Sequence, residues 1–427
     1  MTGPRYVITS CAAESKVRGL ASSVDAENPR DNAWNVNLNN GNANRNNQNN
    51  QGRVLVVRSA PLPRECQGVQ GAVTLRALYE ARLRARKHKV PSYNQLAFDA
   101  NWIDGLLDIQ DRLNAGTWSP RPVTCFIAQR PKARQIHAPD FADRVVHHWL
   151  VPQLEAIYEP GFIHDSYGNR RGKGTHAAVA RLREFVHEVD SGQGGGWYLQ
   201  LDVRNFFNSI HRPTLYAMLK RRMTQRHIDI EVQRAVHALL AHSIENQGII
   251  HRSTAGERAQ VPAYKRLENA APGRGLPIGN LPSQFFANVY LDRFDQFVKH
   301  VLHVPRYARY VDDVVIVHRD RGQLEFWQRA IEEFLRDELR LELKPDIRLR
   351  PLAAGIDFLG YVVYPTHTRV RRRVVRHAFA ALAEANGMPR TDARERKKSV
   401  LASYLGHFSH ADAFRLSASL IEQAEVV

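Results

Sequence analysis

Two adjacent carboxylates, Asp312 and Asp313, stand inside an otherwise mostly apolar run from Tyr307 to Val317. The residues on either side are rich in β-branched and aromatic side chains, so we expect two short strands with the acids in the turn of a hairpin. Paired aspartates are also common in ordinary turns. A metal site becomes the better interpretation because another acid, Asp202, ends a second apolar strand. Carboxylates on two neighbouring strands are typical of two-metal centres that transfer phosphoryl groups.

The roles expected of these acids follow from that chemistry. Asp202 and Asp312 are expected to bind two Mg²⁺ ions, for which Mn²⁺ could substitute, and Asp313 to support them. The backbone carbonyl of Val203 would complete the ligand set. Bound in this way, the ions would lower the pKa of a hydroxyl nucleophile and neutralise charge on a triphosphate.

The composition points to a polyanionic partner. The chain has 427 residues, and its 60 Lys and Arg against 43 Asp and Glu give a net charge of +17. Nucleic acid is the partner that this charge favours, although a basic surface can also serve solubility alone. Cys11, Cys66 and Cys125 are widely spaced, so neither a disulfide framework nor a zinc site is expected. The sequence lacks a membrane-length apolar run and a signal-peptide core, so we expect a cytoplasmic protein without a membrane partner.

Local patterns predict an α+β protein with a central antiparallel sheet. Residues 31–51 hold eleven asparagines between positions 31 and 50, and this tract is expected to be loop or disordered. Strands are predicted around Asp202, through the Asp312 hairpin, and at 346–352 and 356–364. Helices are predicted at 73–89, 93–114, 142–158, 174–189, 213–242, 283–303 and 325–341, and again after the basic run that ends at Arg376.

From about Trp118 to Leu416 the chain resembles a reverse transcriptase, with the segments of that family in order. The resemblance implies that Lys132 and Arg134 hold the incoming triphosphate, although a solvated basic strand end would look similar. The following Gly-rich basic loop would approach the template backbone through Arg170, Arg171 and Lys173.

Further segments imply how the nucleotide would be bound. Phe207 corresponds to the bulky residue under the sugar that excludes a 2′ hydroxyl, although one of Phe206 and Phe207 is expected to be core. Where most of the family has glutamine this chain has Ile278, followed by Gly279, and where most have proline it has Gln284. Tyr310 is also assigned to the nucleotide site.

Two downstream segments complete the resemblance. Lys344 matches the lysine that can protonate the pyrophosphate leaving group, with an ordinary surface lysine as the alternative. The segment 356–363 resembles the primer grip, a hairpin turning at Gly360, in which Phe358, Leu359 and Gly360 would contact nucleic acid.

The resemblance implies an RNA-directed DNA polymerase with a right-hand architecture of fingers, palm and thumb. The expected divisions are an N-terminal extension over 1–70, fingers with N-terminal helices over 71–190, palm over 191–364 and thumb over 365–427. Template RNA, cDNA product and deoxynucleoside triphosphates are the implied partners. A catalytically inert nucleic-acid-binding relative is the alternative from a different class, and an RNA-templated RNA polymerase is disfavoured by Phe207.

The aliphatic residue at Ile278 and the Ser283-Gln284 pair are characteristic of enzymes from diversity-generating retroelements, which copy template adenines inaccurately. Such an enzyme would work with a template-repeat RNA and a basic accessory protein. Related antiphage-defence reverse transcriptases of bacteria share variants of the motif and remain the rival subtype. The tract 31–58 resembles the variable segments that retroelements diversify, and it is equally compatible with a polar linker.

Overall fold

The structure is a computed structural model, and it describes residues 32–36, 43–47, 73–87, 89–129, 132–190, 195–241 and 248–425. The chain divides into two compact units, Met1–Gln70 and Gly71–Val427, each of which is considered by itself. Among the described residues, no helix combines the length and apolar character needed to cross a membrane.

The described part of the first unit is a pair of strands, β1 (Asn32–Val36) and β2 (Ala43–Asn47). They pair antiparallel, from Asn32 opposite Asn47 to Val36 opposite Ala43. The prediction of loop or disorder was therefore wrong for these ten residues. Strand propensity depends strongly on context, and local backbone pairing can override the low preference of asparagine for strands. The rest of the tract lies outside the described residues.

The second unit begins with three helices, α1 (Leu75–Arg86), α2 (Tyr93–Ala100) and α3 (Trp102–Ala115), and a fourth, α4 (Phe141–Tyr158), follows after two strands. A single helix was predicted over 93–114, but Asn101 has a non-helical backbone (φ −132°, ψ 47°) and divides it. Gly105 allows the two resulting helices to approach closely, because a Cβ there would lie 2.8 Å from the Phe98 ring.

The central sheet has the strand order β7-β8-β5-β9, and all its neighbours are antiparallel. Its strands are β5 (Trp197–Asp202), β7 (Tyr307–Tyr310), β8 (Asp313–His318) and β9 (Arg348–Pro351). The predicted hairpin is confirmed as β7 and β8. The predicted strand at 346–352 is present in shorter form as β9. An α+β fold built on an antiparallel sheet is thereby confirmed.

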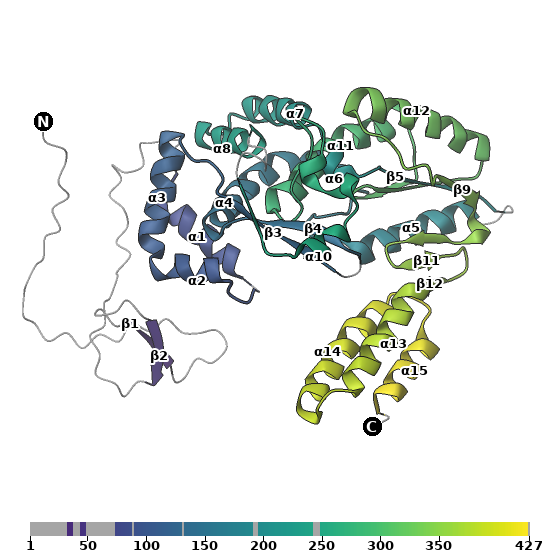
Figure 1. Cartoon of the computed structure of the whole chain (residues 1–427). Coiled ribbons are helices and arrows are strands. Elements are labelled where there is room, and N and C mark those ends of the chain that lie inside the picture. The colour runs from purple at the N-terminus through teal and green to yellow at the C-terminus, as the bar shows by residue number, and fades with distance from the viewer. Residues whose placement is uncertain are drawn as a thin grey trace, which may run out of the picture. The chain divides into compact units, whose positions relative to one another are not determined.

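Helices cover both faces of this sheet, as Figure 1 shows for α12 (Arg321–Leu339) above it and α5 (Thr175–Asp190) below it. Leu199 and Ile316 belong to the core cluster that includes α12 side chains, whereas Tyr198 and Val317 belong to the cluster with α5. Burial on both faces explains why residues 314–317 are continuously apolar and do not alternate with polar residues.

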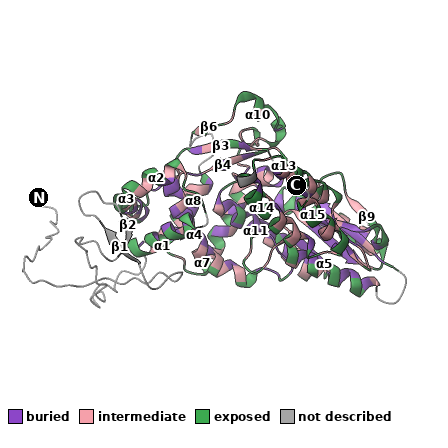
Figure 2. Cartoon of the chain, turned by 90° about the horizontal axis from the view of Figure 1, so that it is seen from below, coloured by how far each residue is buried: buried purple, intermediate pink, exposed green. Residues whose placement is uncertain are grey.

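The most buried helix is α11 (Leu281–Gln296), which continues into a π-helical turn over Phe297–Val301. The region predicted as one helix over 213–242 consists of α7 (Arg212–Gln225) and α8 (Ile230–Ala241), separated at His227, whose φ is +50°. A positive φ cannot continue a right-handed helix, and the sequence pattern does not reveal it. Figure 2 shows the contrast between interior and surface helices: the short α10 (Ala255–Ala259) has exposed and half-buried residues but no buried one.

Two small sheets flank the central one. The first has β3 (Val123–Ala128) between β4 (Arg134–Ala138) and β6 (Ile249–His251), antiparallel to β4 and parallel to β6. The second is the antiparallel series β10 (Ile356–Phe358), β11 (Tyr361–Val363) and β12 (Thr368–Val370). The chain ends in three helices with a core cluster of their own, α13 (Arg372–Asn386), α14 (Arg390–Phe408) and α15 (Phe414–Glu425).

Candidate active site

The three predicted carboxylates lie at one end of the central sheet. Asp202 ends β5 and is the direct partner of Asp313, the first residue of β8, in the antiparallel register. Asp312 precedes it in the β7–β8 turn. The turn also contains Val311 with φ +56°, which is a rare and strained conformation for a β-branched residue and costs of the order of 1–3 kcal/mol. Two acid-bearing strands are therefore adjacent, as the sequence predicted.

Burial and mutual repulsion disfavour negative charge on this group. Burial, together with Asp313 and Asp202, raises the pKa of Asp312 to about 7. Burial and Asp202 raise the pKa of Asp313 to about 6, with Lys344 acting in the opposite direction. Carboxylates crowded in this way are stabilised in their charged form when a cation binds among them.

The Lys344 ammonium contacts the Asp202 carboxylate, and the Lys344 amide donates to the Asp202 carbonyl at 2.8 Å. The other carboxylate oxygen of Asp202, Oδ1, is buried without a hydrogen-bond partner among the described residues. Val203 follows β5 directly and is buried. Within the described residues, no three His, Cys, Asp or Glu side chains form a complete metal cage. The oxygen donors present nevertheless fit Mg²⁺, which usually takes one or two carboxylates and completes its shell with water and substrate phosphates.

A cavity of about 420 Å³ opens over the carboxylates. Lys132 and Arg134, predicted to hold a triphosphate, line it together with Lys344. The sequence reasoning missed further charged residues that line it, namely Asp346, Arg348, Asp357, Arg371 and Arg373. Arg371 and Arg373 belong to the basic run at the start of α13, and that run was the available sequence signal. Asp346 and Asp357 lie within predicted strands, where the pattern gave no sign that they would line the cavity.

A neighbouring cavity of about 250 Å³ brings Phe207 and Ile278 together, with Arg134, Asp312 and Lys344 also lining it. Phe206 is 2% exposed, so the core member of the phenylalanine pair is Phe206. The Ile278 carbonyl accepts a hydrogen bond from the His137 amide at 2.8 Å, which ties its loop to β4. Gly279 has φ +117°, and a Cβ there would lie 2.9 Å from the His137 carbonyl oxygen, so no larger residue fits without strain.

Gly279 and two other residues predicted to bind nucleotide, Gln284 and Tyr310, line neither cavity. Gln284 is exposed on α11 and lines neither cavity. Tyr310 pairs with Asp313 across the hairpin, and its hydroxyl lies 3.5 Å from that of Thr175. Tyr310 therefore supports the turn from the side of α5.

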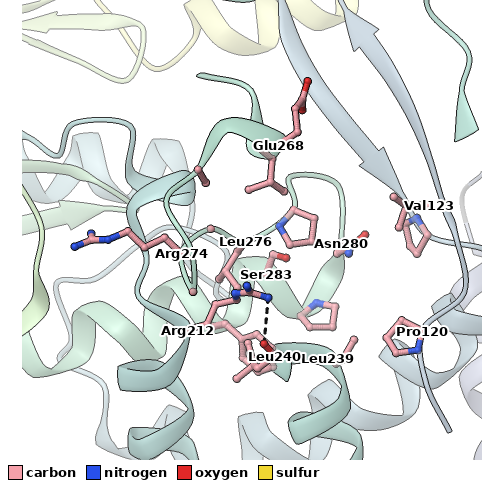
Figure 3. A pocket seen from close by; sticks show the side chains of 18 of the residues that line it. Pro120, Val123, Arg212, Leu239, Leu240, Glu268, Arg274, Leu276, Asn280 and Ser283 are labelled. Atoms are coloured by element: carbon pink, nitrogen blue, oxygen red, sulfur yellow. Dashed lines mark hydrogen bonds between the residues drawn. The ribbon is translucent and has the colours of Figure 1, made fainter. Parts of the chain in front are cut away.

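A third cavity, of about 300 Å³, borders the loop residues on either side of Ile278 (Figure 3). Its lining includes Leu276, Asn280 and Ser283, and Arg212 donates to the Leu240 carbonyl at 3.3 Å across one side. None of the three carboxylates of the candidate site lines this cavity. The loop therefore borders this cavity as well as the one that Ile278 lines.

The basic loop after α4 differs from the prediction. Arg170 was expected to approach template, but its guanidinium donates to the carbonyls of Ile163 (2.7 Å) and Ser166 (2.9 Å) and pairs with Glu159 at 2.9 Å. Its side chain is only 7% exposed. Arg170 therefore stabilises the loop, and its guanidinium is not available to a nucleic acid. Arg171, with a side chain 85% exposed, remains accessible. The Lys173 ammonium lies 5.2 Å from the centre of the Tyr167 ring.

The predicted primer-grip hairpin is present as β10 and β11, with Leu359 and Gly360 in the turn at φ +50° and +97°. Leu359 lines the carboxylate cavity. Phe358 was predicted to contact nucleic acid, but it is 1% exposed and belongs to the core. A Cβ on Gly360 would lie 3.1 Å from the His407 ring, so glycine here allows α14 to pack against the turn.

Comparison with known proteins identifies relatives of this chain. Residues 127–363, more than half of the chain, match the family model described as reverse transcriptase (RNA-dependent DNA polymerase). The group II intron-encoded protein LtrA of Lactococcus lactis subsp. cremoris is 26% identical over 190 residues, covering 44% of this chain and 27% of that protein. Protein YkfC of Escherichia coli (strain K12) is 21% identical over 349 residues, covering 73% and 83%.

The chain therefore spans about a quarter of the length of the intron-encoded relative. Among solved structures, a telomerase from Candida albicans, in complex with a fragment of telomeric RNA, aligns with 10% identity and a TM-score of 0.39. That alignment covers 84% of this chain and 76% of the telomerase chain.

Proposed function

The chain belongs to the reverse transcriptase family, and on that premise we propose that it is an RNA-directed DNA polymerase that extends a primer by two-metal nucleotidyl transfer. The observation that carries the proposal is the pairing of Asp202 with Asp313, beside Asp312 in the turn. Three acids at the end of one sheet, under a cavity lined by basic side chains, suit the transfer of a nucleotide from a triphosphate.

Each group in the cavity has a role in this proposal. Asp202, Asp312, Asp313 and the Val203 carbonyl would hold two Mg²⁺ ions. The chemistry that these ions supply when bound is a lowered pKa for the primer hydroxyl and neutralisation of charge on the triphosphate. Lys132 and Arg134 would bind the triphosphate oxygens through charge-assisted hydrogen bonds. Lys344 would donate a proton to the departing pyrophosphate.

The direct test is primer extension on a defined RNA template. Purified protein is incubated with an RNA template, an annealed DNA primer, the four deoxynucleoside triphosphates and either Mg²⁺ or excess chelator. We expect extension that needs both the metal and the template. Failure to extend any RNA- or DNA-templated primer, with protein shown to be folded, would favour an inert nucleic-acid-binding relative.

Sugar selection gives the first prediction. Phe207→Val should raise the incorporation of ribonucleotides relative to deoxynucleotides by at least roughly tenfold, because the smaller side chain leaves room for a 2′ hydroxyl. Competition between the two kinds of triphosphate measures the ratio. Phe294→Leu is the matched control, since Phe294 is a core residue that lines neither the carboxylate cavity nor the one that Phe207 lines, and its substitution should change stability without changing the ratio. Unaltered discrimination in the Phe207 variant would remove this assignment.

We propose further that the enzyme copies template adenines inaccurately, as a retroelement polymerase that diversifies sequence. Ile278 supports this, because an aliphatic side chain in the nucleotide cavity offers no hydrogen bond to a base or sugar. On this proposal the partners are a template-repeat RNA and an accessory protein of basic character. Sequencing cDNA made on a defined template separates the two subtypes. Errors concentrated at adenines support diversification, whereas faithful or homopolymeric products support the defence role.

A reverse substitution tests the part played by Ile278. Ile278→Gln should lower misincorporation opposite template adenine about fivefold, because a restored polar contact is worth about 1 kcal/mol. Sequencing of cDNA pools measures the error frequency. Ile278→Val keeps the apolar character and should leave the error frequency close to that of the unaltered protein. An equal decrease in both variants would show that polarity at this position is not the cause.

A further inference from the structure

Arg309 is a fully buried arginine that the chemistry described above does not use. It lies on β7, three residues before Asp312, and its side chain is 1% exposed. Its partner Asp295, on α11, is 0% exposed. Removing two charges completely from water is costly, and a buried ion pair often stabilises a protein no more than apolar residues of the same volume. Stability alone is therefore a weak explanation for this pair.

The contacts of the Arg309 guanidinium reach the turn that contains Asp312. Nε and Nη2 donate to the two carboxylate oxygens of Asp295 at 2.7 and 2.6 Å. Nη2 also donates to the Ser166 hydroxyl at 2.9 Å, and Nη1 donates to the Val311 carbonyl at 2.9 Å. Burial would lower the pKa of Arg309, but Asp295 raises it above its ordinary value, so the guanidinium stays charged.

Val311 is held from a second side by the segment after α4. The Arg309 amide donates to the Asp165 carbonyl and the Tyr167 amide donates to the Arg309 carbonyl, both at 2.9 Å. This pairing places Gly168 against the turn, where a Cβ would lie 2.6 Å from Val311 Cγ2 and 2.8 Å from the Val311 nitrogen. The Gly168 carbonyl in turn accepts from Asn288 at 2.8 Å.

We propose that Arg309 is a positioning residue, which with Asp295 holds Val311 in its left-handed conformation and so fixes where the Asp312 carboxylate points. Arginine suits this task because its planar fork binds a carboxylate with two nitrogens and still offers a third donor to the Val311 carbonyl. A lysine has one nitrogen and cannot make the same set of contacts. The effect on catalysis rests on the proposed function, whereas the restraint on the turn does not.

The test compares Arg309→Lys with Arg82→Lys. Arg82 is the matched control. It also forms a largely buried ion pair, in which its guanidinium lies 2.6 Å from the Asp99 carboxylate. Both residues lie on helices away from the three carboxylates. Arg309→Lys should lower kcat roughly 100-fold, because a small misplacement of the Asp312 carboxylate has an effect of that size. The KM for deoxynucleotides should change less than about threefold. Arg82→Lys should lower thermal stability but leave kcat of the folded protein unchanged. Equal kcat in the two variants would overturn the proposal.

A second substitution tests the link to the strained turn. Glycine adopts positive φ without the steric cost that valine has. Val311→Gly introduced into the Arg309→Lys protein should therefore raise kcat to about a tenth or more of the value of the unaltered protein. If the double variant stays as slow as Arg309→Lys, holding the left-handed conformation is not the function of Arg309.

Hydrogen exchange measures the restraint without any catalytic assay. Peptides covering residues 307–318 should exchange faster in Arg309→Lys than in Arg82→Lys or the unaltered protein. Ser166→Ala, which removes one contact of the guanidinium, is the milder variant in case Arg309→Lys does not fold, and it should shift exchange in the same direction. Unchanged exchange in these peptides would overturn the proposal. An unaltered protein that lacks polymerase activity would instead overturn the proposed function and leave this measurement valid.

Discussion

Asp312→Asn is expected to reduce nucleotide incorporation by roughly a thousandfold or more. The amide keeps the shape of the side chain but loses the negative charge that would hold Mg²⁺ beside the primer hydroxyl, and losses of two to three orders of magnitude are common when one electrostatic group is removed. Steady-state primer extension on an RNA template measures the loss, with circular dichroism to establish that the variant is folded.

The control for this substitution is another half-buried acid. Asp292 lies on α11, away from the carboxylate cavity, and burial raises its pKa to about 6. Asp292→Asn therefore removes a carboxyl of similar burial without touching the site, and it should retain most of the activity. Activity above one tenth of the original in Asp312→Asn, or an equal loss in Asp292→Asn, would contradict the assignment of Asp312.

The carboxylate centre could be predicted from sequence because its signals are local. The apolar runs around Asp202 and Asp312 each favour a strand, and adjacent strands in an antiparallel sheet bring their ends together. The structure places Asp202 opposite Asp313, which agrees with that reasoning. Lys132 and Arg134 were assigned from the resemblance to the reverse transcriptase family, and both line the same cavity.

Other features depend on contacts between residues far apart in the chain, and the sequence pattern does not contain them. Asp295 stands in an apolar helix with no local sign that Arg309 would neutralise it. Arg170 looks like any exposed loop arginine until the carbonyls of Ile163 and Ser166 are seen to surround it. The break in the predicted helix at His227 depends on a positive φ, which residue type alone does not indicate for histidine.

Asp312→Asn is also expected to stabilise the protein when no divalent metal is present. The pKa of Asp312 is about 7 in the folded chain against an ordinary 3.8, so the folded state keeps a proton that the unfolded state releases. Stability therefore falls as pH rises from about 4 to 7, and the full penalty is present above pH 7. The asparagine variant does not have this penalty. Its advantage over the unaltered protein should be greater at pH 8 than at pH 5 by about 2 kcal/mol after solvent screening.

Urea denaturation at pH 5 and pH 8, with chelator or with Mg²⁺, measures this difference. Mg²⁺ should stabilise the unaltered protein at pH 8 because it binds the folded state, and it should have little effect on Asp312→Asn. If Asp312→Asn is less stable than the unaltered protein at pH 8 in chelator, the carboxylates do not repel one another as described. The acids would then be held by Lys344 and other cations of the chain itself, and the raised pKa values would not mark a cation site.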